Sequence, residues 1–378
     1  MQVIIIGAGP AGLAVGGALR RRGIPNLVLE KGPAVGMSWR GHYDRLHLHT
    51  VRALSGLPGF GIPRSMGRWV ARADLVRYLE QYAAHHQLEV RPGVEVKRIE
   101  PDGEGWLLQS DQGTLRAPAV IVATGYNHSP VEPRWPGQES FAGELLHSSG
   151  YRNAAPYRGR CVLVAGSGNS GAEIAADLAE GGAAKVYLSV RTPPNIQRRE
   201  ALPGVPTQLV GILAHQLPLG AVDRISLALH RAAFGDLAAK GLPVPDQGVG
   251  TRIKQERIPL IDVGVVAAIR AGTVEVVPAV GGFVDGDVML ANGRRLKVDV
   301  VVAGTGFRRN LEALVGHLGL LGPTGSPRVK GAETGATAPN LYFLGYDNST
   351  RGLIFEIARG ANAIARRIAR THPELSGV

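Results

Sequence analysis

Two glycine-rich loops, each between an apolar run and a stretch of helical pattern, constrain this chain more than any other feature. The first is Gly7-Ala-Gly9-Pro-Ala-Gly12, and the second is Gly166-Ser-Gly168-Asn-Ser-Gly171. A strand that runs into G-x-G-x-x-G and then a helix predicts a dinucleotide site. The glycines let the backbone approach the pyrophosphate, and the helix N-terminus supplies free N–H groups and positive dipole charge. We therefore expect an α/β protein with two Rossmann-like dinucleotide-binding domains.

The two loops differ in the charge that follows them. Glu30 lies about 20 residues after Gly12, where a carboxylate binds the ribose hydroxyls and repels a 2′-phosphate. Arg191 and Thr192 lie about 20 residues after Gly171, and an arginine at that place accommodates a 2′-phosphate. The first loop is therefore predicted to bind FAD or NAD, and the second to bind NADP in preference to NAD.

A second repeat suggests how the domains divide. Ala123-Thr124-Gly125 and Gly304-Thr305-Gly306 each follow an apolar run, so each glycine loop has its own return turn. Such a turn marks a crossing between domains in proteins that bind two dinucleotides. We expect a discontinuous first domain of residues 1–150 and 305–378, and a second domain of residues 151–304 with a helical insertion at about 195–264.

Composition limits the other classes of protein. The 378 residues carry 42 Lys and Arg against 31 Asp and Glu, a formal charge of +11. Nucleic-acid binding is one interpretation of that charge, and a field that attracts anionic cofactors is the other. No basic run is interleaved with aromatic residues, so we favour the second and expect no nucleic-acid partner. A single cysteine, Cys161, excludes a redox-active cysteine pair.

Neither a membrane segment nor a metal site is expected. The apolar stretch 3–19 is interrupted by six glycine and proline residues and follows Met1-Gln2 directly, which favours a strand–turn–helix without a signal peptide and a cytoplasmic location. His42, His47 and His49 raise the possibility of a metal, because H-x-H on a strand shares one face. No cysteine or carboxylate at a suitable spacing completes a ligand set, so no metal is predicted.

The segment before the second loop carries a resemblance to a known family. Phe141-x-Gly143-xxx-His147-xxx-Tyr151 resembles the class B flavin-dependent monooxygenases, which include flavin-containing monooxygenases, N-hydroxylases and the plant YUCCA enzymes. Baeyer–Villiger members usually carry Trp where this chain has Tyr151. The run that begins Tyr43-Asp-Arg-Leu is similar to a YUCCA pattern. A chance match of this eleven-residue pattern is the alternative, and two correctly placed glycine loops count against it.

The resemblance implies cofactors, a reaction and partners. FAD is implied at the first loop and NADPH at the second, with O₂ adding to the reduced flavin as a C4a-(hydro)peroxide. A YUCCA-like member implies decarboxylation of a 2-oxo acid such as indole-3-pyruvate, whereas the broader family implies S- or N-oxygenation. An NADPH-dependent flavoprotein reductase or oxidase would share both loops. The implied partners are a small-molecule substrate and O₂, and the protein would be a monomer or a homodimer.

The resemblance also implies site residues. His49 falls on a histidine of the YUCCA pattern, or where the animal enzymes carry Asn beside the flavin, and a purely structural role is equally open. Arg52 falls near a YUCCA lysine. Arg351, at the start of the last helix, is either a cation for an acidic substrate or the flavin, or a solvated helix cap. These three are the catalytic candidates. The cofactor-binding candidates are Gly7, Gly9, Pro10, Ala11, Gly12, Glu30, Lys31, Trp39, Ala123, Thr124, Gly125, His147, Gly166, Ser167, Gly168, Asn169, Ser170, Gly171, Arg191, Thr192, Gly306 and Asp347.

Overall fold

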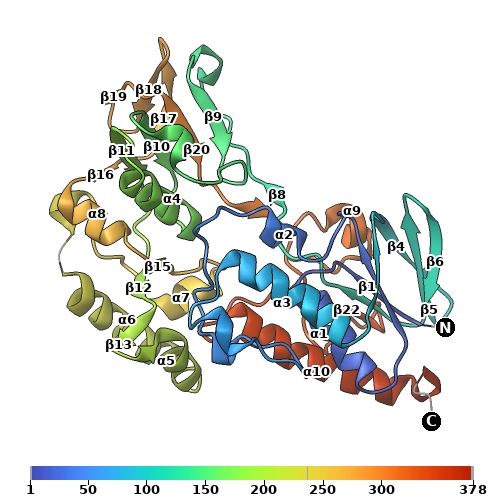
Figure 1. Ribbon diagram of the computed structural model, residues 1–378. Helices are drawn as coiled ribbons and strands as arrows, with labels where there is room; N and C mark the ends of the chain where they lie inside the picture. The colour runs from blue at the N-terminus through green and yellow to red at the C-terminus, as the bar shows by residue number, and fades with distance from the viewer. Residues whose placement is uncertain (1, 236, 376–378) are drawn as a thin grey trace. The chain divides into compact units, whose positions relative to one another are not determined.

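The computed structural model describes residues 2–235 and 237–375, which form two compact units (Figure 1). Unit 1 consists of Met1–Gly41, Thr50–Ser129 and Phe307–Val378, and unit 2 of His42–His49 and Pro130–Gly306. The chain thus belongs to the α/β class, with one five-stranded parallel sheet in each unit.

The parallel sheet of unit 1 has the strand order β22-β7-β1-β2-β3. Its strands are β1 (Val3–Ile6), β2 (Asn26–Glu30), β3 (Glu89–Pro92), β7 (Val120–Val122) and β22 (Leu341–Phe343). Every residue of β1 is buried, because the strand lies between two others, and Ile4 pairs with Leu27 on one side and Val120 on the other. An all-apolar run suits a central strand that is covered on both faces.

Helices and a second sheet complete unit 1. Its helices are α1 (Pro10–Arg20), α2 (Met37–Arg40), α3 (Arg72–His85), α9 (Glu312–Val315) and α10 (Leu353–Thr371). An antiparallel sheet contains β4 (Val96–Asp102), β5 (Gly105–Ser110) and β6 (Gly113–Ala117). Ile99, Trp106 and Leu108 of that sheet join the same core as Ile4 and Phe343 of the parallel sheet. The two sheets of unit 1 therefore share one hydrophobic core.

Unit 2 repeats the parallel sheet, with the order β16-β11-β10-β20-β9. The strands are β9 (Glu144–His147), β10 (Cys161–Ala165), β11 (Lys185–Ser189), β16 (Val274–Val277) and β20 (Val300–Ala303), and the helices beside them are α4 (Asn169–Glu180) and α8 (Val265–Ala271). In both units the strand before the glycine loop lies beside the strand before the return turn. Ligands of such sheets bind where the strand order reverses, at the carboxyl ends of these two strands.

Unit 2 also contains an antiparallel sheet, formed by β17 (Val280–Val284), β18 (Asp287–Leu290) and β19 (Arg295–Leu296). The residues between the first two strands, Asp285 and Gly286, have φ angles of 51° and 84°. An Asp-Gly pair with two positive φ angles is the turn that two-residue hairpins favour. Phe283 on β17 belongs to a core cluster that also contains Leu163 and Val301 of the parallel sheet.

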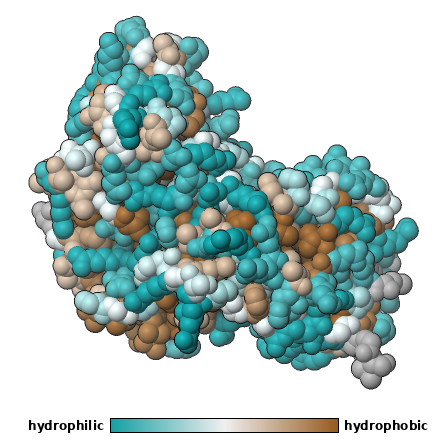
Figure 2. Space-filling model, in the orientation of Figure 1, coloured by the Kyte–Doolittle hydropathy of each residue, from teal (hydrophilic) through white to brown (hydrophobic). Residues whose placement is uncertain are grey.

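The predicted helical insertion contains both helices and strands. Its helices are α5 (Thr207–Ala214), α6 (Leu219–Phe234) and α7 (Val249–Lys254), and its strands are β12 (Ile196–Arg198), β13 (Glu200–Leu202), β14 (Val205–Pro206) and β15 (Leu260–Asp262). Most of the large apolar side chains that are exposed in the described chain belong to this segment: Leu202, Leu209, Leu213, Leu217, Ile225, Leu229 and Ile258. Figure 2 shows brown side chains gathered where Figure 1 draws α5 and α6.

The unit boundaries differ from the predicted domain boundaries in three places, of which the smallest is residues 305 and 306, predicted for the first domain but in unit 2. Residues 130–150, predicted to belong to the first domain, lie in unit 2, because β9 pairs in parallel with β20 from Val300↔Glu144 to Ala303↔His147. Residues 42–49 also lie in unit 2, although both flanking segments belong to unit 1. The chain passes from unit 1 to unit 2 after Ser129 and back again after Gly306. The short strands at these two places, β8 (Ser129–Pro130) and β21 (Phe307–Arg308), pair with each other.

Candidate functional site

In the first loop, three glycines have different geometric reasons to be glycine. Gly7 has a φ of +106°, and a Cβ there would lie 2.6 Å from the Ala123 carbonyl oxygen of the return turn. A Cβ on Gly12 would lie 1.9 Å from the Gly7 carbonyl oxygen. A Cβ on Gly9 would meet no described atom within 4 Å. Gly7 and Gly12 therefore close the turn, whereas Gly9 leaves open space at the start of α1.

Glu30 ties the first loop to the end of β2. Its Oε2 accepts a hydrogen bond from the Ala8 N–H, and its Oε1 accepts one from the Gly32 N–H, both at 2.8 Å. The residue is only 8% exposed. A carboxylate has about four acceptor positions, so both oxygens retain capacity for a ribose hydroxyl. Lys31, the next residue, is exposed, and Trp39 on α2 is half-buried.

The second loop has the same geometry. Gly166 has a φ of +120°, and its Cβ would lie 2.4 Å from the Gly304 carbonyl oxygen, while a Cβ on Gly171 would lie 1.9 Å from the Gly166 carbonyl oxygen. At Gly168, an added Cβ again meets no described atom within 4 Å. Because α1 begins at Pro10 and α4 at Asn169, the residues Pro10, Ala11, Asn169 and Ser170 form the first helical turns.

Both loops fit a dinucleotide. Gly9 and Gly168 are the N-cap residues of α1 and α4, and neither helix has a side-chain cap within the described chain. The first N–H groups of a helix have no partner inside the helix, so these two helices present donors where the open glycines leave room. A phosphate fits this combination of open space, N–H donors and positive dipole charge.

The side chains around the second loop have unequal roles. The Asn169 amide donates to the Pro259 carbonyl at 3.1 Å and accepts from the Ile261 N–H at 2.8 Å, so it holds β15 against the start of α4. Ser167 is partly exposed beside the open glycine. Arg191 and Thr192 follow the end of β11, and the Arg191 side chain is exposed. Arg191 can therefore reach a phosphate from solvent without first breaking a buried contact.

The return turns are held by hydroxyl groups. Gly125 and Gly306 have φ angles of 70° and 84°, a conformation that favours glycine. In unit 1 the Thr124 hydroxyl lies 2.7 Å from the Tyr346 hydroxyl, and in unit 2 the Thr305 hydroxyl donates to the Val131 carbonyl at 2.5 Å. The two turns are thus equivalent in backbone shape but are fixed by different partners.

The residues of the Phe141–Tyr151 motif make structural contacts within unit 2. The Phe141 ring lies 5.1 Å from the Phe283 ring, and a Cβ on Gly143 would lie 2.6 Å from the Asp299 carbonyl oxygen. His147 Nε2 donates to the Gly306 carbonyl at 3.0 Å, while its Nδ1 accepts from the Ser149 N–H. Burial lowers the pKa of His147, which keeps this ring neutral. The motif therefore secures β9 beside β20 and braces the second return turn.

The catalytic candidates His49 and Arg52 lie in different units. His49 is in unit 2, with Nε2 3.8 Å from Glu173 Oε1, and its Nδ1 is buried without a hydrogen-bond partner among the described residues. Burial, reinforced by the charge of Arg199, lowers the pKa of His49 to about 3, so the ring is neutral at pH 7. Arg52 is in unit 1 and donates to the Ile62 carbonyl at 3.1 Å.

The third candidate, Arg351, forms an ion pair. Its Nε donates to Glu356 Oε1 at 2.6 Å, and its Nη2 donates to Glu356 Oε2 at 2.9 Å, within unit 1. Both side chains are less than one-fifth exposed. This forked pair cancels most of the charge that a lone arginine would offer to an acidic substrate. Asp347 lies nearby in the sequence, 3.8 Å from Lys330 Nζ, and burial raises its pKa.

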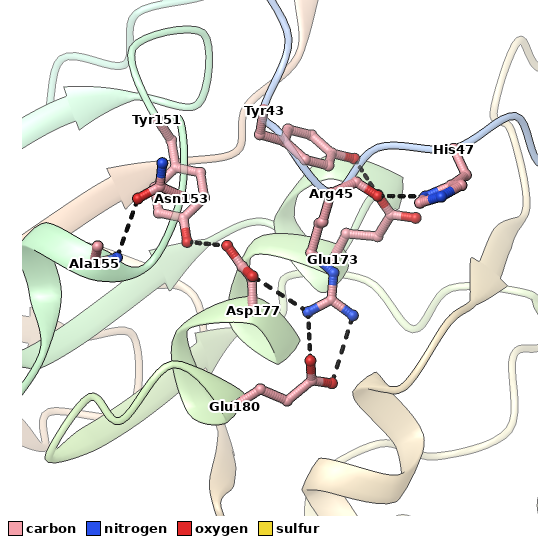
Figure 3. Close-up of polar contacts among 9 residues, drawn as sticks. All are labelled: Tyr43, Arg45, His47, Tyr151, Asn153, Ala155, Glu173, Asp177 and Glu180. Atoms are coloured by element: carbon pink, nitrogen blue, oxygen red, sulfur yellow. Dashed lines mark hydrogen bonds and ion pairs between the residues drawn. The ribbon is translucent and has the colours of Figure 1, made fainter. Parts of the chain in front are cut away.

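Sequence reasoning did not identify a polar cluster on α4 (Figure 3). Glu173, Asp177 and Glu180 are spaced i, i+4 and i+7, so they share one face of the helix. Tyr43 donates to Glu173 Oε2 at 2.5 Å, Tyr151 donates to Asp177 Oδ2 at 2.6 Å, and Arg45 donates to Glu180 at 2.9 Å. The sequence does show three carboxylates at helical spacing in an alanine-rich helix, which could have indicated the cluster. It does not show which residues bind them.

The described residues contain neither a metal-binding cluster nor a membrane-spanning helix. Across residues 2–235 and 237–375, no group of three or more His, Cys, Asp or Glu side chains is arranged to hold a metal ion. Within the same ranges, no helix has the length and apolar character that crossing a membrane requires.

Known proteins resemble the chain over almost its full length. Residues 4–203 match the family model described as pyridine nucleotide-disulphide oxidoreductase. The rice (Oryza sativa subsp. japonica) indole-3-pyruvate monooxygenases YUCCA8 and YUCCA4 are 35% and 33% identical to it, over 97% of this chain and 89% and 87% of theirs. The solved flavin-containing monooxygenase from Stenotrophomonas maltophilia is 27% identical, with a TM-score of 0.72 and 98% of each chain covered.

These matches agree with the two equivalent loops, and together they identify the family. Its members bind FAD and NADP(H). The chain belongs to the class B flavin-dependent monooxygenases, the NADPH-dependent enzymes of EC 1.14.13 type, and within them it is YUCCA-like.

Proposed function

We propose that this monooxygenase acts on a small 2-oxo acid such as indole-3-pyruvate and releases CO₂. The observation that carries the proposal is the match to relatives that are named indole-3-pyruvate monooxygenases, at up to 35% identity over 97% of the chain. Tyr151, where Baeyer–Villiger members usually carry Trp, counts against a Baeyer–Villiger outcome. Oxygenation at sulfur or nitrogen is the alternative within the family.

We assign FAD to the loop of unit 1 and NADPH to the loop of unit 2. Support comes from the opposite charges at equivalent strand ends, where Glu30 suits ribose hydroxyls and Arg191 suits a 2′-phosphate. The cofactor-binding candidates near these loops, together with Asp347, remain proposed contacts. On this assignment the FAD domain corresponds to unit 1 and the NADPH domain to unit 2.

The residues of the chain then have distinct tasks. When bound, NADPH supplies a hydride and the flavin carries out the reaction with O₂. The N-termini of α1 and α4 bind the two pyrophosphates, and His147 holds the Gly306 turn beside the second loop. His49 remains a proposed catalytic residue, and since its ring is neutral at pH 7 it offers hydrogen-bonding nitrogens and no positive charge. Arg52 remains a proposed catalytic residue, and Arg351 could meet an acidic substrate or the flavin only if its pairing with Glu356 loosened.

The test is a balanced assay with the purified, FAD-loaded protein. One 2-oxo acid, one O₂, one NADPH and one proton should give the acid that is one carbon shorter, CO₂, water and NADP⁺. With ¹⁸O₂, the product indole-3-acetate should carry one ¹⁸O atom in its carboxylate. Equal yields of CO₂, indole-3-acetate and NADP⁺ would support the proposal.

The other outcomes separate the alternatives. NADPH oxidation that yields only hydrogen peroxide, with every substrate tested, would favour a reductase or oxidase. Oxygenation of a sulfide or an amine, with indole-3-pyruvate left unchanged, would favour the S- and N-oxygenating branch. A protein that binds no flavin would contradict the cofactor assignment itself.

A further inference from the structure

A short segment of unit 2 contacts α4, the helix that follows the second loop. We call this segment, His42–His49, the strap. The residues before and after it in the sequence belong to unit 1. Its backbone is tied to unit 2, because the Asp44 N–H donates to the Arg152 carbonyl at 2.8 Å. The side-chain amide of Asn153 also donates to Asp44 Oδ2 at 2.8 Å. The strap is therefore anchored independently of the side chains that reach α4.

Tyr43 is the buried contact between the strap and α4. The residue is 2% exposed, and its hydroxyl donates to Glu173 Oε2, which is equally buried, at 2.5 Å. Burial raises the pKa of the Tyr43 phenol far above its ordinary value, so it remains a donor at any working pH. Ser170 is a hydrogen-bonding neighbour of the same phenol and acts on its pKa in the opposite direction, lowering it. One hydroxyl thus connects two residues in the first turns of α4.

Those two residues belong to the part of α4 that faces the second loop. Ser170 lies between Gly168, which leaves the open space, and Gly171, which cannot carry a side chain. Glu173 is one helical turn further along. The strap's other contact, from Arg45 to Glu180, lies at the far end of the helix. Tyr43 therefore acts on the end of α4 that presents its N–H groups.

We propose that Tyr43 is a positioning residue for NADPH: through Ser170 and Glu173 it holds the first turns of α4 in the orientation that binds the pyrophosphate. This rests on the proposed assignment of NADPH to the second loop. Without the phenol hydroxyl, Glu173 loses a buried donor and Ser170 loses the partner that orients its own hydroxyl. Since the bond from Tyr43 to Glu173 lies within unit 2 and the first loop belongs to unit 1, its loss should weaken NADPH binding and leave FAD binding in place.

The experiment compares Tyr43→Phe with Tyr157→Phe in the FAD-loaded full-length enzyme. Tyr157 is a suitable control because it is also buried in unit 2, and its hydroxyl lies 3.4 Å from a carboxylate that is not on α4, that of Glu144. We expect Tyr43→Phe to raise the Kd and KM for NADPH about 5- to 20-fold, with kcat at saturating NADPH within twofold of wild type. Tyr157→Phe should change the Kd less than twofold.

A double-mutant cycle with Ser170→Ala tests the route of the effect. If Tyr43 acts through Ser170, Tyr43→Phe should weaken NADPH binding less than twofold further in the Ser170→Ala background. Effects that multiply fully in the double mutant would overturn the proposal, as would an unchanged Kd in Tyr43→Phe. Should Tyr43→Phe fail to fold, an unchanged NADPH affinity in Ser170→Ala overturns it as well.

NADPH binding by the wild-type protein distinguishes an error in the cofactor assignment from an error in the role of Tyr43. If the wild-type protein binds FAD but not NADPH, the cofactor assignment fails and takes the inference with it. If the wild-type protein binds NADPH and Tyr43→Phe binds it equally well, only the positioning role of Tyr43 is wrong.

Discussion

In each glycine loop, different positions require glycine for two different reasons. At Gly12 and Gly171 a side chain would overlap a carbonyl oxygen of the protein itself, at 1.9 Å in both cases. At Gly9 and Gly168 a side chain would meet no described atom within 4 Å. The first pair is therefore needed for the turn to fold, and the second pair leaves space for a ligand beside the loop.

This distinction predicts the behaviour of Gly168→Ala. Its φ of −74° and ψ of 178° suit alanine, so the variant should fold and retain FAD. The new methyl group occupies the space into which the pyrophosphate must come, and we expect the KM for NADPH to rise at least tenfold in steady-state assays. Gly220→Ala, also with open space for its Cβ, is the control. Equal KM values for the two variants would contradict the prediction.

Glu173 predicts a pH dependence of stability. Burial raises its pKa from 4.5 to about 7, so the folded protein holds this proton more tightly than the unfolded chain does. The stabilisation is therefore full below pH 4.5 and is lost as the pH rises towards 7. Glu173→Gln cannot ionise. Relative to wild type, its free energy of unfolding should increase by about 3 kcal/mol between pH 4.5 and pH 8.

Urea unfolding at the two pH values measures that difference. The pKa of His49 shifts in the opposite direction, to about 3, and costs stability as the pH falls below 6.5. His49 is present in both proteins, so its contribution cancels to first order in the comparison. A difference between variant and wild type that does not vary with pH would show that Glu173 keeps an ordinary pKa.

Residues with a local signature were predictable, and residues with distant partners were not. Glu30 and the loop glycines follow from spacing along the chain. The bond from Tyr43 to Glu173 joins residues 130 positions apart, and a glutamate on a helix resembles many solvated ones. Arg351 was predicted as a free cation or a cap, because the direction of its partner Glu356 is set only once α10 has formed.

Among the elements, β9 has the most specific sequence requirement. It forms the edge of the sheet in unit 2, and its partner β20 follows it by about 150 residues in the chain. Gly143 precedes the strand and approaches the Asp299 carbonyl so closely that no side chain fits. The strand is also secured from its other end by the bond between His147 and Gly306.

Gly143→Ala should therefore destabilise the β9–β20 pairing. The added Cβ would lie 2.6 Å from the Asp299 oxygen, and we expect a loss of about 1–3 kcal/mol in unfolding free energy, seen as a lower Tm. Gly150→Ala is the matched control, since its Cβ would lie at an ordinary 3.4 Å from the His147 oxygen. If both variants melt like wild type, the close approach at Gly143 has no energetic weight.

Element types were predicted better than element partners. Apolar runs and glycine loops predicted β1, β10 and the helices after them. The run 282–290 is divided by the Asp285-Gly286 turn into two strands of a hairpin. The edge strand β9 was placed with the first domain, because its short segment contains no information about the sheet that it joins.

At the scale of the whole molecule, two similar units are distinguished by charge. Glu30 ends β2 and Arg191 follows the equivalent strand β11. A carboxylate at such a place disfavours a 2′-phosphate, and an arginine accommodates one. The fold alone would let either loop take either nucleotide. We therefore infer that these two residues direct each cofactor to its own unit.

Arg191→Gln tests this at the second loop. Losing the cation should lower kcat/KM with NADPH about 10- to 100-fold and leave kcat/KM with NADH within twofold. Arg224→Gln on α6, also exposed, removes the same net charge far from β11 in the sequence and should change neither. An equal loss with both cofactors would mean that Arg191 does not read the 2′-phosphate.

The position of β22 has a consequence for how the protein is made. β22 pairs with β7, and α10 packs against α1, yet these two late elements begin at residues 341 and 353. While a ribosome synthesises the chain, β7 stands as an open sheet edge from residue 122 until residue 343 has emerged. The sheet of unit 2, whose strands end at residue 303, can close first. An open sheet edge pairs readily with other chains, so the half-finished sheet of unit 1 is more prone to aggregation than the finished one.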